Sequence, residues 1–330
     1  MSHPPFKPAW WLPGPHLQTL WPNLLRRLPD VALRRERLEL SDGDFLDLDW
    51  SHASTGPLVV VLHGLEGSSR SHYAVGIHHA LHLHGWRSVL MHFRGCSGTP
   101  NRLARGYHAG DTGDLEHVVS ILREREPGTP IAVIGYSLGG NVLLKWLGEQ
   151  GAQAAIVAAA AVSVPFDLSN ATERLNRGLS RVYQWVLLRR LRESMRDKWR
   201  AMGCMDEQAP LNSMRTLRDF DNMVTAPLHG FTGADDYYTR CSSRGFLKNI
   251  QVPTLILQAQ DDPFMTRDAL PGIDDLSPSI EFELTPGGGH VGFVTGSSPW
   301  RARYYPEQCL PAFLKRQLAI ASNVSPTAFR

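Results

Sequence analysis

The sequence predicts an α/β fold, in which a mostly parallel central sheet is flanked by helices and a helical lid is inserted between two strands. Two observations lead to this prediction. From residue 58 to residue 164, continuous apolar runs alternate with helical patterns, which is typical of a parallel sheet that is buried on both faces. From residue 167 to about residue 221 this alternation stops, and the chain becomes helical and rich in arginine.

Composition and charge narrow the class of protein. With 330 residues and a net charge of +2, the chain can bury a large core and gives no general reason to expect a nucleic-acid partner. No window approaches eighteen apolar residues, and the first 22 residues do not resemble a signal peptide, so we expect a cytoplasmic protein without stable membrane insertion. The cysteines lie far apart, which fits reduced thiols rather than a disulfide framework or a zinc site: Cys96, Cys204, Cys241 and Cys309. The oligomeric state stays open.

The chain begins with a segment rich in proline and tryptophan. Residues 4–22 contain too many prolines for a helix, so we expect residues 1–30 to form an extended arm on the core, anchored by Trp10, Trp11, Leu17 and Trp21. Residues 35–50 alternate apolar and polar around a turn at 41–44, which predicts a hairpin at the antiparallel edge of the sheet.

The remaining elements follow in order from their apolar patterns. We expect strands at 58–62, 88–93, 131–134, 154–164, 253–257 and 280–284, and helices at 71–84, 111–126, 141–147 and 304–321. A helical excursion between strands of one sheet is best interpreted as a lid over the edge where such sheets bind ligands. The predicted division is therefore a core of 31–166 and 222–330 and a lid of 167–221.

The most informative motif is Gly-Tyr-Ser-Leu-Gly at 135–139, which directly follows an apolar strand and precedes a helix. This is the setting in which G-x-S-x-G places a nucleophilic serine on a sharp turn. Such a turn strains the serine backbone. It also leaves no room for a side chain two residues before or after the serine, which explains Gly135 and Gly139. Ser137 is therefore the candidate nucleophile.

A serine nucleophile needs a base, and the base needs an orienting acid. In this kind of fold both follow the serine, in the order acid then histidine, on loops after later strands. The strand at 253–257 leads into Asp261 and Asp262, and the strand at 280–284 leads into a glycine-rich loop that carries His290. We expect His290 as the base and favour Asp262 as the acid, with Asp261 as the alternative.

Acyl transfer also needs two backbone N–H groups that stabilise the oxyanion. The residue after the nucleophile, Leu138, supplies one candidate. The other candidate is Leu65, in the glycine-flanked loop 63–67 after the first parallel strand. We expect no cofactor and no metal: His78, His79, His82 and His84 share one predicted helix, but no carboxylate or cysteine joins them in a ligand pattern.

These features resemble the α/β-hydrolase superfamily, and more narrowly its YheT-like group of esterases. The narrower resemblance rests on WWLP at 10–13, HLQT at 16–19, FRGCSG at 93–98, YHAGDTGD at 107–114 and GGHVGF at 288–293, and on spaced residues between them: Asp221, Gly230, Phe231, Asp236, Tyr237, Tyr238, Ser242, Ile250, Pro253, Asp261 and Asp262. The resemblance covers nearly the whole chain. It implies a Ser-Asp-His carboxylesterase or acylglycerol lipase without a cofactor, active in lipid metabolism, with the second aspartate as the triad acid.

The sequence therefore predicts a serine hydrolase that cleaves carboxylic esters through an acyl-enzyme. Apolar residues in the predicted lid, such as Trp185 and Leu187, indicate a lipophilic small-molecule ester as the substrate. Two alternatives stay open at this point. An acyltransferase would use the same triad with an alcohol in place of water, and a non-catalytic binding protein would use only the fold.

Overall fold

The computed structural model describes residues 4–52, 56–204 and 211–323. The helices are α1 (Pro15–Leu24), α2 (His72–Leu83), α3 (Gly113–Arg125), α4 (Leu138–Gln150), α5 (Leu168–Leu175), α6 (Ser180–Met202), α7 (Leu217–Phe220), α8 (Ala226–His229), α9 (Ala234–Cys241) and α10 (Pro306–Asn323). The strands are β1 (Leu33–Glu39), β2 (Phe45–Ser51), β3 (Leu58–Leu62), β4 (Arg87–Met91), β5 (Ile131–Tyr136), β6 (Ala158–Val162), β7 (Thr254–Ala259), β8 (Ile280–Thr285), β9 (Val294–Thr295) and β10 (Arg303–Tyr304).

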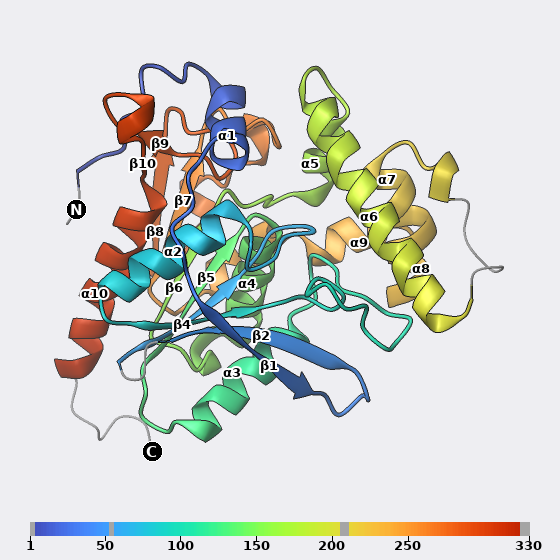
Figure 1. Cartoon of the computed structure of the whole chain (residues 1–330), viewed down its shortest axis with the longest axis horizontal. Helices are drawn as coiled ribbons and strands as arrows, with labels where there is room; N and C mark the ends of the chain where they lie inside the picture. The colour runs from blue at the N-terminus through green and yellow to red at the C-terminus, as the bar shows by residue number, and fades with distance from the viewer. Residues whose placement is uncertain (1–3, 53–55, 205–210, 324–330) are drawn as a thin grey trace.

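The central sheet has the order β1-β2-β4-β3-β5-β6-β7-β8 (Figure 1). The strands from β4 to β8 run parallel, whereas the hairpin β1–β2 is antiparallel and forms one edge. The predicted parallel sheet with an antiparallel edge is therefore confirmed. In the middle strand β3, Leu58, Val60 and Leu62 pack with α3 and α4 on one face, while Val59 and Val61 pack with α2 and α10 on the other. This alternation explains why the strand is apolar at every position.

The N-terminal segment differs from its prediction. The expected extended arm contains helix α1, which begins at Pro15 and continues past Pro22. A proline in the first helical turn costs no hydrogen bond because the N–H groups there have no intrahelical partner, and the helix ends two residues after Pro22. Two of the expected anchors are also wrong, because Trp10 and Leu17 are exposed, whereas Trp11 and Trp21 contact each other edge to face.

Between β6 and β7 the chain leaves the sheet for a group of helices. Figure 1 shows α5 to α8 on the side of the molecule opposite α10. This group has a small apolar core of its own, to which α6 and α7 contribute Tyr183, Leu188, Leu217 and Phe220. The helical character does not stop at the predicted limit of residue 221, since a π-helical turn at Asp221–Thr225 leads directly into α8.

No helix in the described part of the chain is long and apolar enough to cross a membrane.

Candidate active site

Ser137 lies between β5 and α4 with a backbone conformation of φ 51° and ψ −119°. Positive φ is rare for a residue with a side chain and costs on the order of 1–3 kcal/mol. The flanking glycines make this turn possible. A Cβ on Gly135 would lie 2.5 Å from the carbonyl oxygen of Gly139, and a Cβ on Gly139 would lie 2.5 Å from that of His63. Because these are backbone atoms, they cannot move aside, and only glycine fits at either position.

The structure brings Ser137, His290 and Asp262 together. His290 Nε2 lies 2.9 Å from Ser137 Oγ, and His290 Nδ1 lies 2.8 Å from Asp262 Oδ2. An ionised carboxylate can only accept hydrogen bonds, so this geometry favours the tautomer with the proton on Nδ1 and leaves Nε2 free to accept from the serine. Phe264 stacks on the imidazole at a centroid distance of 3.7 Å, and its N–H donates to Asp262 Oδ1 at 2.8 Å. The imidazole is thus held on its face as well as on its edge.

The second candidate acid has a different partner. Asp261 Oδ1 accepts from the N–H of Gly289 at 2.9 Å, one residue before the histidine. Burial raises the pKa of Asp261 above its ordinary value, and the neighbouring charge of Asp262 raises it further. Asp261 therefore braces the histidine loop, while Asp262 contacts the imidazole itself.

Helix α1 also supports the histidine loop, which the sequence analysis missed. The N–H of His290 donates to Thr19 Oγ1 at 2.9 Å. A Cβ on Gly289 would lie 2.4 Å from the carbonyl oxygen of Pro15, so the loop and α1 are in close contact. The only signal in the sequence was the HLQT motif at 16–19, which contains this threonine.

The loop after β3 contains a backbone N–H group without an acceptor among the described residues. The N–H of Gly64 donates to the hydroxyl of Tyr73 at 2.8 Å, and the N–H of Glu66 donates to the hydroxyl of Tyr107 at 2.9 Å. The N–H of Leu65, between them, has no acceptor among the described residues, and neither has that of Leu138 at the first position of α4. Both leucines line the same cavity as Ser137.

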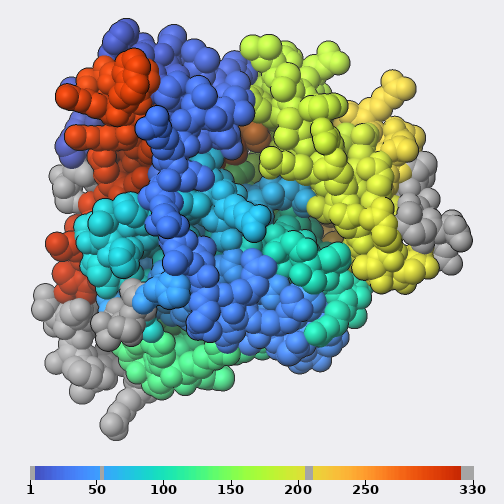
Figure 2. All heavy atoms as spheres, in the orientation of Figure 1, coloured from blue at the N-terminus to red at the C-terminus, as the bar shows by residue number. Residues whose placement is uncertain are grey.

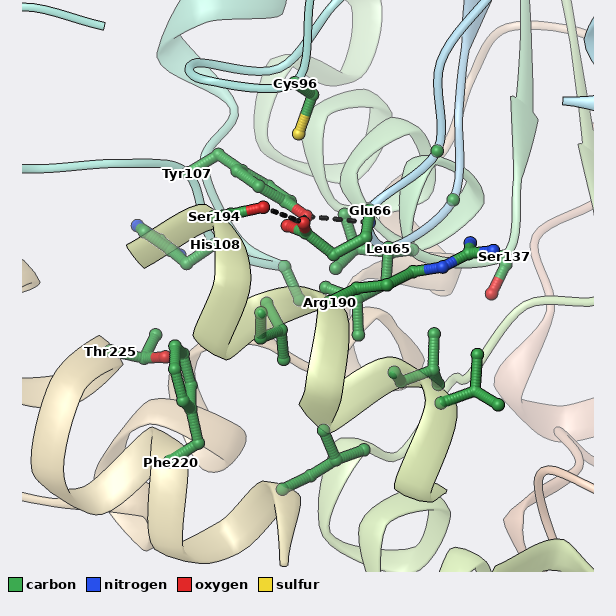
Figure 3. Close-up of a pocket in the computed structure, with 18 of the residues that line it drawn as sticks. Leu65, Glu66, Cys96, Tyr107, His108, Ser137, Arg190, Ser194, Phe220 and Thr225 are labelled. Carbon is green, nitrogen blue, oxygen red and sulfur yellow. Dashed lines mark hydrogen bonds between the residues drawn. The ribbon is translucent and has the colours of Figure 1, made fainter. Parts of the chain in front are cut away.

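A second set of contacts holds this loop, and it too was missed. The hydroxyl of Tyr107 donates to Glu66 Oε1 at 2.9 Å, and Ser194 of α6 donates to the other oxygen of the same carboxylate (Figure 3). Tyr107 itself stacks on Phe93 with centroids 5.1 Å apart. The chain separations, 41 residues from Glu66 to Tyr107 and 128 to Ser194, explain why no local pattern revealed these contacts.

The cavity in front of Ser137 has a volume of about 640 Å³ and lies between the sheet edge and the group of helices. In Figure 2, the N-terminal segment and α6 stand on either side of a recess. Much of the lining that α5, α6 and α7 contribute is apolar: Leu168, Leu175, Val182, Val186, Leu187, Leu191, Met195, Leu217 and Phe220.

Asp221 and Lys198 are titratable groups in the wall of this cavity. Burial raises the pKa of Asp221 to about 6, although Tyr238 and Thr225 each donate a hydrogen bond to its carboxylate at 2.7 Å. Burial lowers the pKa of Lys198 to about 8, and its ammonium donates to Asn101 Oδ1 at 2.8 Å. Neither group contacts Ser137, so both belong to the walls of the cavity.

The histidines of α2 do not gather in one place. His78 is fully buried and contacts Ser88 Oγ at 2.7 Å, whereas His82 and His84 are exposed. Among the residues that the structure describes, no three histidine, cysteine, aspartate or glutamate side chains are placed to hold a metal ion.

Fold and geometry together define a class of protein: an α/β protein with Ser, Asp and His side chains on the loops that follow β5, β7 and β8, at the carboxyl edge of a parallel sheet. The sequence profile described as the α/β hydrolase fold matches residues 57–297. The chain belongs to the α/β hydrolase family.

Within that family, the chain belongs to the YheT-like group. It is 45% identical over 288 residues to the protein named "Putative esterase YheT" of Escherichia coli (strain K12), covering 86% of this chain and 85% of that one. It is 33% identical over 310 residues to the phospholipase ABHD3 of Mus musculus, covering 91% and 75%. The fold also resembles the Pyrococcus furiosus esterase Pf2001, with a TM-score of 0.57 at 16% identity, covering 96% of this chain and 100% of that one.

Proposed function

We propose that this chain is a serine hydrolase that cleaves carboxylic esters through an acyl-enzyme. The observation that carries the proposal is the continuous hydrogen-bond path from Ser137 Oγ through His290 to Asp262. A serine hydroxyl is a weak nucleophile unless a base accepts its proton, and here a base with a fixed tautomer lies within hydrogen-bond distance. The relatives named as an esterase and a phospholipase support ester hydrolysis as the reaction.

The steps follow from the positions of the groups. Ser137 Oγ attacks the ester carbonyl carbon while His290 Nε2 accepts the hydroxyl proton, and Asp262 stabilises the imidazolium that forms. The N–H groups of Leu65 and Leu138 donate to the oxyanion of the tetrahedral intermediate, and each donor is worth about 3 kcal/mol of transition-state stabilisation. His290 then protonates the leaving alcohol, and a water molecule attacks the acyl-enzyme by the same route to release the acid.

A fluorophosphonate tests the nucleophile directly, because it forms a stable adduct only with an activated serine. Wild type and Ser137→Ala are treated in parallel and their intact masses are measured. We expect one adduct on the wild type and none on the variant. An adduct on both would place the reactive serine elsewhere, and no adduct on folded wild type would favour a binding protein over an enzyme. Product analysis with competing alcohols then separates hydrolysis from acyl transfer.

We also propose that the helices of residues 167–221 act as a lid over a lipophilic acyl chain, because their apolar side chains line the cavity. Leu187→Trp fills part of the apolar lining and is expected to shift the preference among p-nitrophenyl esters toward shorter acyl chains. The matched control is Arg189→Trp, which adds the same ring at an exposed position of α6 that does not line the cavity. An unchanged acyl-length profile in Leu187→Trp would contradict the lid proposal.

A further inference from the structure

One cationic side chain that lines the cavity has no hydrogen-bond or ion-pair partner among the residues that the structure describes. Of the lysines and arginines that line it, Arg94 donates to Asp114 at 2.7 Å and Lys198 donates to Asn101 at 2.8 Å. Arg190 forms no hydrogen bond or ion pair with any residue in the described parts of the chain. Its neighbour Arg189, on the outside of α6, is paired with Glu193 at 2.8 Å, so the helix does offer acidic partners to its arginines.

Arg190 extends from α6 into the cavity and points toward Ser137 (Figure 3). Its charge also acts on the loop beside the nucleophile. Burial raises the pKa of Tyr73, whose hydroxyl accepts from Gly64, and the positive charge of Arg190 opposes that shift. A guanidinium is always charged and presents a planar set of donors that fits two oxygens of one anionic group. Here those donors face the position at which a substrate ester would react.

The sequence of α6 places two kinds of side chain along the cavity. Arg190, Ser194 and Lys198 follow one another at four-residue spacing, and therefore lie on one stripe of the helix. The adjacent stripe is mainly apolar and contains Leu187 and Leu191, and all five residues line the cavity. Because Ser194 and Lys198 are already engaged with Glu66 and Asn101, Arg190 is the member of the polar stripe whose donors have no acceptor within 4–52, 56–204 and 211–323.

We propose that Arg190 binds an anionic group, a phosphate or a carboxylate, carried by the alcohol part of the substrate, and that the enzyme therefore selects negatively charged lipophilic esters over neutral ones. This inference rests on the proposed function. The charge belongs to the alcohol part because the apolar stripe accommodates the acyl chain, and an ionised group buried against leucines without a partner would be strongly disfavoured.

The test compares two esters with the same octanoyl chain, 1-octanoylglycerol and 1-octanoylglycerol 3-phosphate, below the concentrations at which they form micelles. Release of octanoate gives kcat/KM for each. We expect Arg190→Ala to lower the ratio of kcat/KM for the phosphate ester to that for the neutral ester by about tenfold to a hundredfold, the usual loss when one charge-assisted hydrogen-bonded contact is removed. Arg189→Ala is expected to leave this ratio unchanged, and Arg190→Lys to retain part of the preference.

Ionic strength provides a second readout. Added salt screens a solvent-accessible charge, so the wild-type ratio is expected to fall between 50 mM and 500 mM sodium chloride, and the Arg190→Ala ratio is expected to stay constant. Equal ratios in wild type and Arg190→Ala, or a wild-type ratio that does not respond to salt, would overturn the proposal.

Binding in the Ser137→Ala background separates this proposal from the proposed function. There we expect the Kd of 1-octanoylglycerol 3-phosphate, measured by calorimetry, to rise about tenfold on adding Arg190→Ala and not on adding Arg189→Ala. If the wild type hydrolyses neither ester, the proposed function fails, but a rise in Kd would still support anion binding at Arg190. If the Kd does not change, anion binding at Arg190 is refuted whatever the enzyme hydrolyses.

Discussion

The strained backbone of Ser137 predicts an unusual order of stability for two inactive variants. At φ 51° and ψ −119°, a residue with a Cβ is disfavoured and glycine is not. Ser137→Ala and Ser137→Gly both remove Oγ and its hydrogen bond to His290, so that loss cancels in a comparison between them. The two variants differ only in the Cβ and in the backbone freedom of the unfolded chain.

The expected difference is the balance of two terms. Removing the Cβ relieves a strain of about 1–3 kcal/mol, whereas glycine usually costs about 0.5–1 kcal/mol in conformational entropy. Ser137→Gly should therefore be more stable than Ser137→Ala by about 1 kcal/mol. For a chain of 330 residues, the entropy of unfolding per residue implies that 1 kcal/mol corresponds to about 1.5 °C in Tm.

Thermal unfolding of the two variants, followed by circular dichroism, measures this difference. Ser120 in the middle of α3 provides the control, because its backbone is helical. There the glycine variant should be less stable than the alanine variant by about 1 kcal/mol. If Ser137→Gly is also the less stable variant, the strain at Ser137 is smaller than the entropic cost of glycine, and the reasoning from a strained turn is refuted.

Three further predictions concern the loop after β3, the aspartates Asp261 and Asp262, and the carboxylate of Asp221. Tyr107→Phe leaves the N–H of Glu66 without its acceptor, so the loop is held less firmly, and kcat should fall about tenfold or more at nearly constant KM; a change in KM alone would contradict this. Asp262→Asn should lower kcat about 10⁴-fold by favouring the wrong tautomer of the histidine, whereas Asp261→Asn, which contacts only the loop, should cost less than tenfold; equal losses would refute the assignment. The pKa of Asp221 is about 6 in the folded state, against an ordinary 3.8, so the folded state binds more protons than the unfolded state between these values. The contribution of Asp221 to stability is therefore present below pH 4 and is lost as the pH rises to 6. In urea titrations at pH 4 and 7, Asp221→Asn should gain about 2 kcal/mol relative to wild type on going to pH 7, and parallel pH curves would contradict this prediction.

The parts of the fold that sequence could predict are those encoded by local repetition. The apolar strands from β3 to β6 alternate with the helices α2, α3 and α4, and G-x-S-x-G between strand and helix fixes the location of Ser137. Helix α1 was missed because prolines were counted against a helix without regard to where in the helix they stand. Pro15 stands where no intrahelical N–H is needed, so it starts a helix instead of preventing one.

The parts of the site that could not be predicted depend on contacts between distant segments. The sequence favours Asp262 over Asp261 but leaves both open, because the two aspartates are neighbours in one loop and the turn after β7 determines which carboxylate contacts the imidazole. Arg190 was one of eleven basic residues in the predicted lid of 167–221, and nothing local distinguished it from its neighbours. Its lack of a partner among the described residues is a property of the folded chain, since it depends on where their acidic side chains lie.

Helix α6 contributes both to the proposed binding of the substrate and to the support of the loop after β3. Ser194 of this helix donates to the carboxylate of Glu66, and the N–H of Glu66 donates to the hydroxyl of Tyr107. Leu65, whose N–H is the proposed oxyanion donor, is the residue directly before Glu66. One turn earlier on the same stripe, Arg190 points toward Ser137. A substrate that binds to Arg190 therefore contacts the same helix that holds the loop carrying the proposed oxyanion donor. Both contacts belong to one helix. A movement of α6 away from the cavity would therefore separate the anionic group from Arg190 and, at the same time, break the hydrogen bond from Ser194 that supports the loop. The helix that selects the substrate is thus also a support of the groups that act on it.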